Sequence, residues 1–180
     1  MQNMKIKQFL IPFLEVFEIL AVVLVSIYVI YGFIAQPFLV QGASMQPNFY
    51  SGDYLLVDEA TYHFRSPERG EVIVFHNPNN PAEFYIKRVV GLPGEEVVIN
   101  DGKVLINGKV LDESYLPQGL EVNGQYVFQL GQDEYFVMGD NRPQSYDSRS
   151  WGPLEKSFIV GVVRLRFWPP NEFSSFSYES

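Results

Sequence analysis

The sequence predicts a mainly β protein: a small antiparallel β-domain or irregular barrel, preceded by one N-terminal transmembrane helix. Two observations carry this prediction. One long apolar run lies near the N-terminus, and beyond residue 36 short runs rich in Val, Ile, Phe and Tyr alternate with Gly, Pro, Asn and Asp. The chain has 180 residues, which suits one domain plus an anchor better than two independent domains.

The apolar run occupies residues 19–35 and contains no charged residue. At about 1.5 Å per residue it would extend roughly 25 Å, near the lower limit for crossing a bilayer. A buried core helix is the alternative interpretation. Ala35 suits the −1 position of a secretory cleavage site, but the large Phe33 stands at −3, so we expect the segment to stay attached. Residues 1–18 are interpreted as a cytoplasmic or interfacial lead-in, partly helical.

The distribution of basic residues predicts the orientation of this anchor. Lys5 and Lys7 precede the apolar run, whereas the first basic residue after it is Arg65. Cytoplasmic flanks of membrane helices are enriched in Lys and Arg. We therefore expect a single-pass protein with its N-terminus in the cytoplasm. Residues 36–180 would form a β-domain on the extracytoplasmic side of the membrane.

Composition excludes several classes of function. The formal net charge is −8, and it belongs to residues 36–180 because the two Lys and two Glu before them cancel. Nucleic-acid binding relies on clustered Lys and Arg, so no nucleic-acid partner is expected. The absence of cysteine excludes disulfides, thiolate metal sites and a cysteine nucleophile. Two histidines are too few for a zinc site of three or four nitrogen or sulfur ligands, so we expect neither metal nor cofactor.

Strands and turns follow from local patterns. Asp101-Gly102 and Asn107-Gly108 supply the positive φ angles that tight hairpins require. Residues 77–82 (NPNNPA) are interpreted as an exposed loop, and residues 153–158 as sufficient for one helical turn. The predicted strands are Tyr54–Val57, Glu71–Phe75, Phe84–Val90 and Tyr135–Met138.

The first segment that could carry chemistry surrounds Ser44. This serine follows Gly42-Ala43, and a serine in a glycine-containing turn can expose its hydroxyl and place its own N–H near a developing oxyanion. Most serines beside glycine are merely turn residues, so the pattern alone is weak. Its closeness to the anchor suggests that Met45 and Phe49 dip into the membrane interface.

The second segment places Lys87 inside an apolar strand. Alternation puts Lys87 on one face with Tyr85 and Val89, and Ile86 and Arg88 on the other. A lysine acts as a base at neutral pH only if its amine loses its proton, which burial favours. Lowering the pKa from about 10.4 to about 8 costs roughly 3 kcal/mol. The alternative is a lysine that extends its amine into water.

The third segment, residues 137–152, is dense in Gly, Asp, Asn, Ser and Arg. Its simplest interpretation is a turn held by a local ion pair, either Asp147 with Arg149 or Asp140 with Arg142. Ser145 could instead accept and donate hydrogen bonds that hold an amine in place. The segment by itself leaves these alternatives open.

Other catalytic classes find little support. A Ser-His-Asp triad would need His63 or His76, but both lie in loop-like surroundings and nothing marks either as a base. We expect them to be surface or rim residues. A paired aspartate motif of the kind used by aspartic proteases is not recognisable in the sequence.

Taken together and in this order, the three segments resemble bacterial type I signal peptidases (leader peptidases), which use a Ser–Lys dyad. The resemblance covers nearly the whole chain from the anchor onward, and GDNRPQSYDSR is its most specific motif. It also includes SGDYLLVDE (51–59), RGEVIVF (69–75) and RLRFWP (164–169). The resemblance implies a β-domain of the signal-peptidase type. The implied activity is cleavage of signal peptides from exported preproteins, with those peptides and the lipid bilayer as partners.

The resemblance also implies roles for individual residues. Ser44 matches the nucleophile, Lys87 the general base, and Ser145 the serine that orients the lysine amine. Asp147 and Arg149 match residues that brace the site. The Ser44 N–H would hold the oxyanion. Some family members add a serine hydroxyl two residues before the nucleophile, but residue 42 is glycine here, so a second donor is not identified.

Substrate recognition is implied as well. The substrate would lie as an added β-strand between residues 38–41 and 84–86. Shallow apolar pockets would admit small residues at −1 and −3, and the residues expected to shape them are Phe38, Val40, Tyr85 and Ile86. Two other functions stay open from the sequence: a Ser–Lys self-cleaving repressor-type protease, and a catalytically inactive membrane-tethered β-domain that serves as an adaptor.

Overall fold

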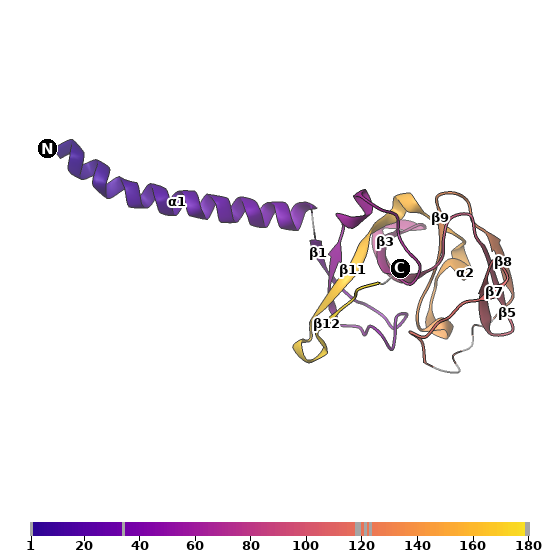
Figure 1. Cartoon of the computed structure of the whole chain (residues 1–180). Helices are drawn as coiled ribbons and strands as arrows, with labels where there is room; N and C mark the ends of the chain where they lie inside the picture. Colours follow the sequence, from indigo (N-terminus) through magenta and orange to yellow (C-terminus); the bar gives the residue numbers. More distant parts are fainter. Residues whose placement is uncertain (1, 34, 118–119, 121, 123, 179–180) are drawn as a thin grey trace.

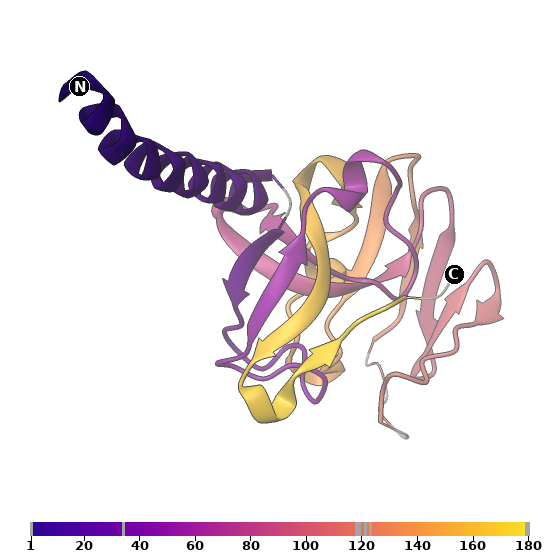
Figure 2. The ribbon, with the colours of Figure 1, turned by 60° about the vertical axis from the view of Figure 1, so that its left-hand side comes forward.

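The computed structural model describes the chain except residues 1, 34, 118–119, 121, 123 and 179–180, and the side chains of residues 2–11 and 29–33. A single helix, α1 (Gln2–Phe33), projects away from the β-sheets that follow it (Figures 1 and 2). It continues through Pro12, so the lead-in predicted as only partly helical is helical as far as it is described.

Within the side chains that the structure describes, no helix has both the length and the apolar character of a membrane span. Part of the predicted anchor, residue 34 and the side chains of residues 29–33, lies outside this description.

Two antiparallel sheets follow the helix, which confirms the mainly β, antiparallel prediction. The larger sheet has the order β1-β2-β11-β3-β4-β9-β10, with β12 paired to β11, and the smaller has the order β7-β6-β5-β8. The strands of the larger sheet are β1 (Ala35–Leu39), β2 (Tyr54–Asp58), β3 (Val72–Asn77), β4 (Asn80–Gly91), β9 (Glu134–Met138), β10 (Leu154–Glu155), β11 (Ile159–Trp168) and β12 (Ser174–Ser175). Those of the smaller sheet are β5 (Glu96–Asn100), β6 (Lys103–Ile106), β7 (Lys109–Val110) and β8 (Tyr126–Gln129).

The short helices are α2 (Ser148–Trp151) and the 3-10 turns η1 (Thr61–His63), η2 (Arg142–Gln144), η3 (Lys156–Phe158) and η4 (Pro170–Glu172). The helical turn predicted at residues 153–158 is thus divided, because β10 occupies its first half and η3 its second.

All four strands predicted from sequence are present, as β2, β3, β4 and β9. The two predicted hairpins are also confirmed, and Asp101 and Asn107 have positive φ angles of 50° and 49°. The prediction of a loop at residues 77–82 is wrong in part, because β3 and β4 are joined by a tight turn and β4 already begins at Asn80. This start includes Pro81, which a strand tolerates where it has an unpaired edge.

Alternation along β3 places side chains in two different cores. Val72 and Val74 face one cluster, which also contains Met45 and Phe49, whereas Ile73 and Phe75 face another. Met45 and Phe49 are each only 1% exposed. The expectation that they reach the membrane interface is therefore wrong: they lie in the core beneath the Ser44 loop, where burial is more favourable for large apolar side chains.

Candidate active site

A groove of about 360 Å³ lies between β1, with the loop that follows it, and the first half of β4. β1 is the outermost strand of the larger sheet, and β9 pairs with β4 only from Arg88 onward, so each strand presents an unpaired edge within the described sheet. The groove residues include Ser44, Lys87 and all four predicted pocket residues, Phe38, Val40, Tyr85 and Ile86. The two segments predicted to border a substrate strand therefore line one groove.

The structure brings Ser44 and Lys87 together although they lie 43 positions apart in the sequence. The Lys87 Nζ donates a hydrogen bond to Ser44 Oγ at 2.8 Å and another to the Ile86 carbonyl at 2.9 Å. The carbonyl can only accept, so it keeps one amine N–H engaged in either protonation state. If the amine is neutral, its nitrogen has a lone pair. At the same Nζ–Oγ distance of 2.8 Å, this lone pair can accept the proton of the Ser44 hydroxyl.

Burial shapes the charge state of this amine. Lys87 is 4% exposed, and burial lowers its pKa from the ordinary value of 10.5 to about 8. The charges of Asp147 and Asp140 oppose the shift and that of Arg149 assists it. Each of these carboxylates is itself paired with an arginine, Asp147 with Arg149 and Asp140 with Arg88. The site therefore has no unpaired carboxylate among its described residues to hold the lysine protonated.

The Asp147–Arg149 pair is one of the two local ion pairs that the sequence suggested. Arg149 donates to both carboxylate oxygens at 2.8 Å, and the Gly139 N–H donates to the same carboxylate at 3.1 Å. Burial alone would raise the pKa of Asp147, but the hydrogen bonds and charge of Arg149 outweigh it and the pKa is lowered. Arg149 also donates to the Arg142 carbonyl at 2.7 Å. This pair joins the two ends of the loop that follows β9.

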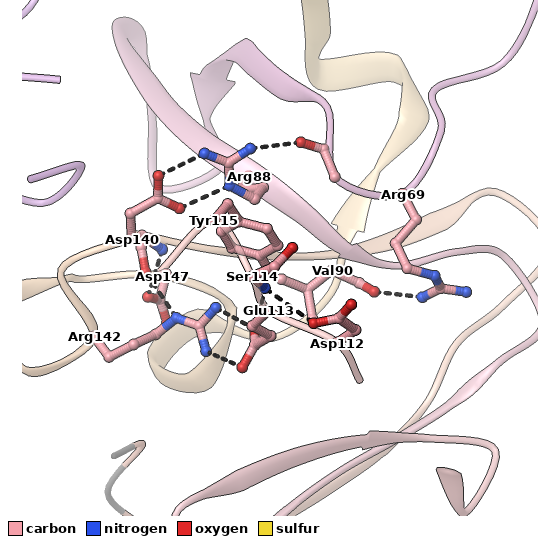
Figure 3. Close-up of polar contacts among 12 residues, drawn as sticks. Arg69, Arg88, Val90, Asp112, Glu113, Ser114, Tyr115, Asp140, Arg142 and Asp147 are labelled. Carbon is pink, nitrogen blue, oxygen red and sulfur yellow. Dashed lines mark hydrogen bonds and ion pairs between the residues drawn. The ribbon is translucent and has the colours of Figure 1, made fainter. Parts of the chain in front are cut away.

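The other suggested pair, Asp140 with Arg142, does not form. Arg88 instead donates to both oxygens of the buried Asp140 at 2.8 and 2.7 Å, and Arg142 pairs with Glu113 (Figure 3). Sequence reasoning missed Arg88, Asp140 and Glu113 as parts of the site. The sequence did contain one signal, because Arg88 stands within an apolar strand. A charge buried in this way needs a partner of opposite charge.

Ser145 lies beside the loop that contains Ser44 but does not bond the Lys87 amine. Its Oγ is buried and has no hydrogen-bond partner among the described residues. The hydroxyl lies near enough to Asp147 to favour the ionised carboxylate, yet the two do not meet hydrogen-bond geometry. The hydrogen bond predicted between Ser145 and Lys87 is therefore not present in this structure.

Gly139 allows this close packing. A Cβ on Gly139 would lie 2.2 Å from Ser145 Oγ and 2.4 Å from the Ser44 carbonyl oxygen, far inside contact distance. Gly42 has a different role: its φ of +90° lies in the region that favours glycine, and its missing side chain leaves open space. The backbone therefore approaches closely at Gly139 and turns sharply at Gly42.

The two histidines are outside the groove lining. His63 lies near the Glu59 carbonyl at 3.2 Å, and His76 lies near that of Pro81 at 2.8 Å. Neither contacts Ser44. The geometry therefore favours the lysine over either histidine as the partner of this hydroxyl.

Comparison with known proteins adds an independent line of evidence. The family described as "Signal peptidase, peptidase S26" matches residues 13–168. The signal peptidase I of Leptolyngbya laminosa is 41% identical over 148 residues, which are 77% of this chain and 71% of that protein. The signal peptidase IB of Staphylococcus aureus (strain COL) is 36% identical over 171 residues, 86% of this chain and 88% of that protein. The probable signal peptidase I-2 of a Synechocystis species is 39% identical over 145 residues, 76% of this chain but only 65% of that protein.

Proposed function

The chain belongs to the signal peptidase family, peptidase S26, and from that premise we propose that Ser44 and Lys87 form a catalytic dyad that removes signal peptides from exported preproteins. The protein acts as a type I signal peptidase, a serine endopeptidase. The observation that carries the dyad is the 2.8 Å contact between Ser44 Oγ and a buried Lys87 amine whose pKa is lowered to about 8.

Each step of the reaction uses groups already in place. Ser44 Oγ attacks the scissile carbonyl carbon while its proton passes to the neutral Lys87 amine. The carbonyl electron pair moves onto oxygen, and the Ser44 N–H donates to the resulting oxyanion. The protonated amine then gives its proton to the departing peptide nitrogen, leaving an acyl ester on Ser44. Water, deprotonated by Lys87, attacks this ester and releases the signal peptide.

The groove supports recognition of an extended peptide. A substrate strand can pair with the unpaired edges of β1 and β4, while alternate side chains enter pockets. The rings of Phe38 and Phe84 meet edge to face with centroids 5.2 Å apart, which limits the space beside them. Phe38, Val40, Tyr85 and Ile86 then select small residues at −1 and −3.

Two supporting roles complete the site. Asp147 and Arg149 brace the loop, and the charge of Arg149 offsets part of the stabilisation that the Asp147 carboxylate gives to protonated Lys87. The role assigned to Ser145, whose hydroxyl has no partner among the described residues, is to orient the amine. A second oxyanion donor is not assigned.

Cleavage of a preprotein is the direct test of this function. Purified protein in detergent is expected to cut a preprotein immediately after a small-x-small sequence, and Ser44→Ala is expected to be inactive. Ser157→Ala, which removes an exposed hydroxyl outside the groove, serves as the matched control and should retain full activity. A wild-type protein that binds the preprotein without cutting it would indicate the adaptor function instead.

The lowered pKa of Lys87 predicts how activity depends on pH. The active form is the neutral amine, so kcat/KM should rise about tenfold per pH unit below pH 8 and level off above it. The measurement is kcat/KM from pH 6 to pH 10 on one preprotein. A plateau reached near pH 6.5 would instead indicate a histidine base.

The membrane anchor is part of the proposal. Described apolar side chains of α1, among them Phe17, Leu24 and Val25, are mostly exposed, and burial in lipid would remove this unfavourable surface from water. We assign residues 19–35 as the single span, residues 1–18 to the cytoplasmic side and residues 36–180 to the extracytoplasmic face of a plasma or thylakoid membrane. Protease added outside intact cells should digest the β-domain; protection there, with digestion from the cytoplasmic face, contradicts this topology.

A further inference from the structure

One residue contacts both peptide groups that flank the nucleophile. The Asn141 N–H donates to the Ser44 carbonyl at 3.0 Å, and the Asn141 side-chain Nδ2 donates to the Ala43 carbonyl at 3.0 Å. Asn141 lies 98 residues further along the chain than Ala43, so the contact depends on the tertiary fold. These two bonds constrain the backbone on both sides of Ser44.

Peptide geometry gives the side-chain bond a consequence for catalysis. A trans peptide is planar, so its C=O and N–H point in opposite directions. The described cis peptides are at Gln46-Pro47 and Trp168-Pro169, and the Ala43–Ser44 peptide is not among them. Holding the Ala43 oxygen therefore fixes the direction of the Ser44 N–H, which points away from Asn141.

The Ser44 N–H is also free to serve a ligand. Among the described residues it donates to no protein acceptor, whereas the Ala43 carbonyl accepts from both Asn141 Nδ2 and, at 3.2 Å, the Gln46 N–H. Ser44 is half-buried and lines the groove, and a backbone N–H that is removed from water without a partner is unfavourable unless a ligand satisfies it. The carbonyls of Ala43 and Ser44 are thus held by hydrogen bonds from Asn141, whereas the Ser44 N–H is available to bind a ligand.

Resting on the proposed function, we infer that the Asn141 side chain is a positioning residue for the oxyanion hole, acting through the Ala43–Ser44 peptide. It does not touch the substrate. When the substrate carbonyl becomes an oxyanion, the donor that receives it is already aimed, so no backbone rotation is needed in the transition state. This role is distinct from that of Lys87, because the lysine controls the proton and the asparagine controls the direction of the N–H.

The test compares Asn141→Ala and Asn141→Asp in the full chain in detergent. Both remove the donor to Ala43, and the aspartate keeps the side-chain volume if the alanine variant folds poorly. We expect kcat to fall about 10–100-fold, less than the 10²–10³-fold loss seen when an oxyanion donor is deleted outright. KM should not change in either variant, and the pH at which the rate levels off should not change in Asn141→Ala, which adds no charge. Asn100→Ala, an exposed asparagine at the end of β5, is the matched control and should match wild type.

A peptide aldehyde separates positioning from a general structural effect. Its adduct with Ser44 places an oxygen in the oxyanion hole, so its affinity should fall with kcat, while the affinity of the cleaved signal peptide should stay constant. Equal loss of both affinities, a shifted pH profile in Asn141→Ala, or an unchanged kcat in Asn141→Asp would each overturn the inference. If wild-type protein cleaves no preprotein, the proposed function itself fails; if it does and the Asn141 variants equal it, only this inference fails.

Discussion

Replacing Lys87 with methionine is expected to reduce kcat/KM by about 10²–10⁴-fold, the range contributed by general acid–base catalysis. Methionine has a similar length and no ionisable group, so Ser44 would lose its proton acceptor while the core stays filled. The measurement is preprotein cleavage at pH 8. Lys103→Met, at an exposed position in the smaller sheet, is the matched control and should leave activity unchanged. Substantial cleavage by Lys87→Met would contradict the dyad.

The same variant should be more stable than wild type at neutral pH. The unfolded chain holds the Lys87 proton up to about pH 10.5, whereas the folded protein releases it near pH 8. Burial of the charged amine therefore costs about 3 kcal/mol below pH 8, and this cost disappears as the pH rises to 10.5. Urea unfolding should show a gain for Lys87→Met of up to about 3 kcal/mol at pH 7 and much less at pH 10. A variant less stable than wild type at pH 7 would show that the amine stabilises the fold.

Of the substitutions proposed, Asp140→Ala is expected to destabilise the protein most. The free energy of unfolding should fall by about 3–5 kcal/mol. Asp140 is fully buried, accepts two hydrogen bonds from Arg88 and accepts one from Asn48 at 2.8 Å. Its removal would leave the guanidinium of Arg88, itself only 7% exposed, without its counter-charge. The melting temperature should fall by on the order of 10 °C.

Activity should fall in Asp140→Ala even below the melting temperature. The loop that contains Asp140 continues into Asn141, whose N–H holds the Ser44 carbonyl. Asp133→Ala removes an exposed carboxylate and is the control. The double variant Arg88→Met/Asp140→Leu should recover most of the lost stability, because a buried ion pair can be replaced by apolar side chains at little cost. An Asp140→Ala protein that unfolds at the same urea concentration as wild type would contradict this account.

The resemblance of three sequence segments to one family predicted that Ser44 meets Lys87 and that Asp147 pairs with Arg149, and the structure shows both contacts. Each local pattern taken alone left its interpretation open. Asn141 and Asp140 lie in the same motif as Ser145, yet nothing local showed that they reach Ala43 and Arg88. The predicted hydrogen bond from Ser145 to the amine is absent, and the Ser145 hydroxyl has no partner among the described residues.

What the sequence determined by itself was local. Alternating apolar residues specify strands, and Asp-Gly and Asn-Gly specify the two hairpins, because both depend on backbone preferences of adjacent residues. The tertiary structure alone decided that Asp140 pairs with Arg88 rather than Arg142, a contact across 52 positions. It also decided that Met45 lies in the core. Such outcomes depend on which surfaces meet when the sheets pack, and a buried charge then pairs with the partner that packing places beside it.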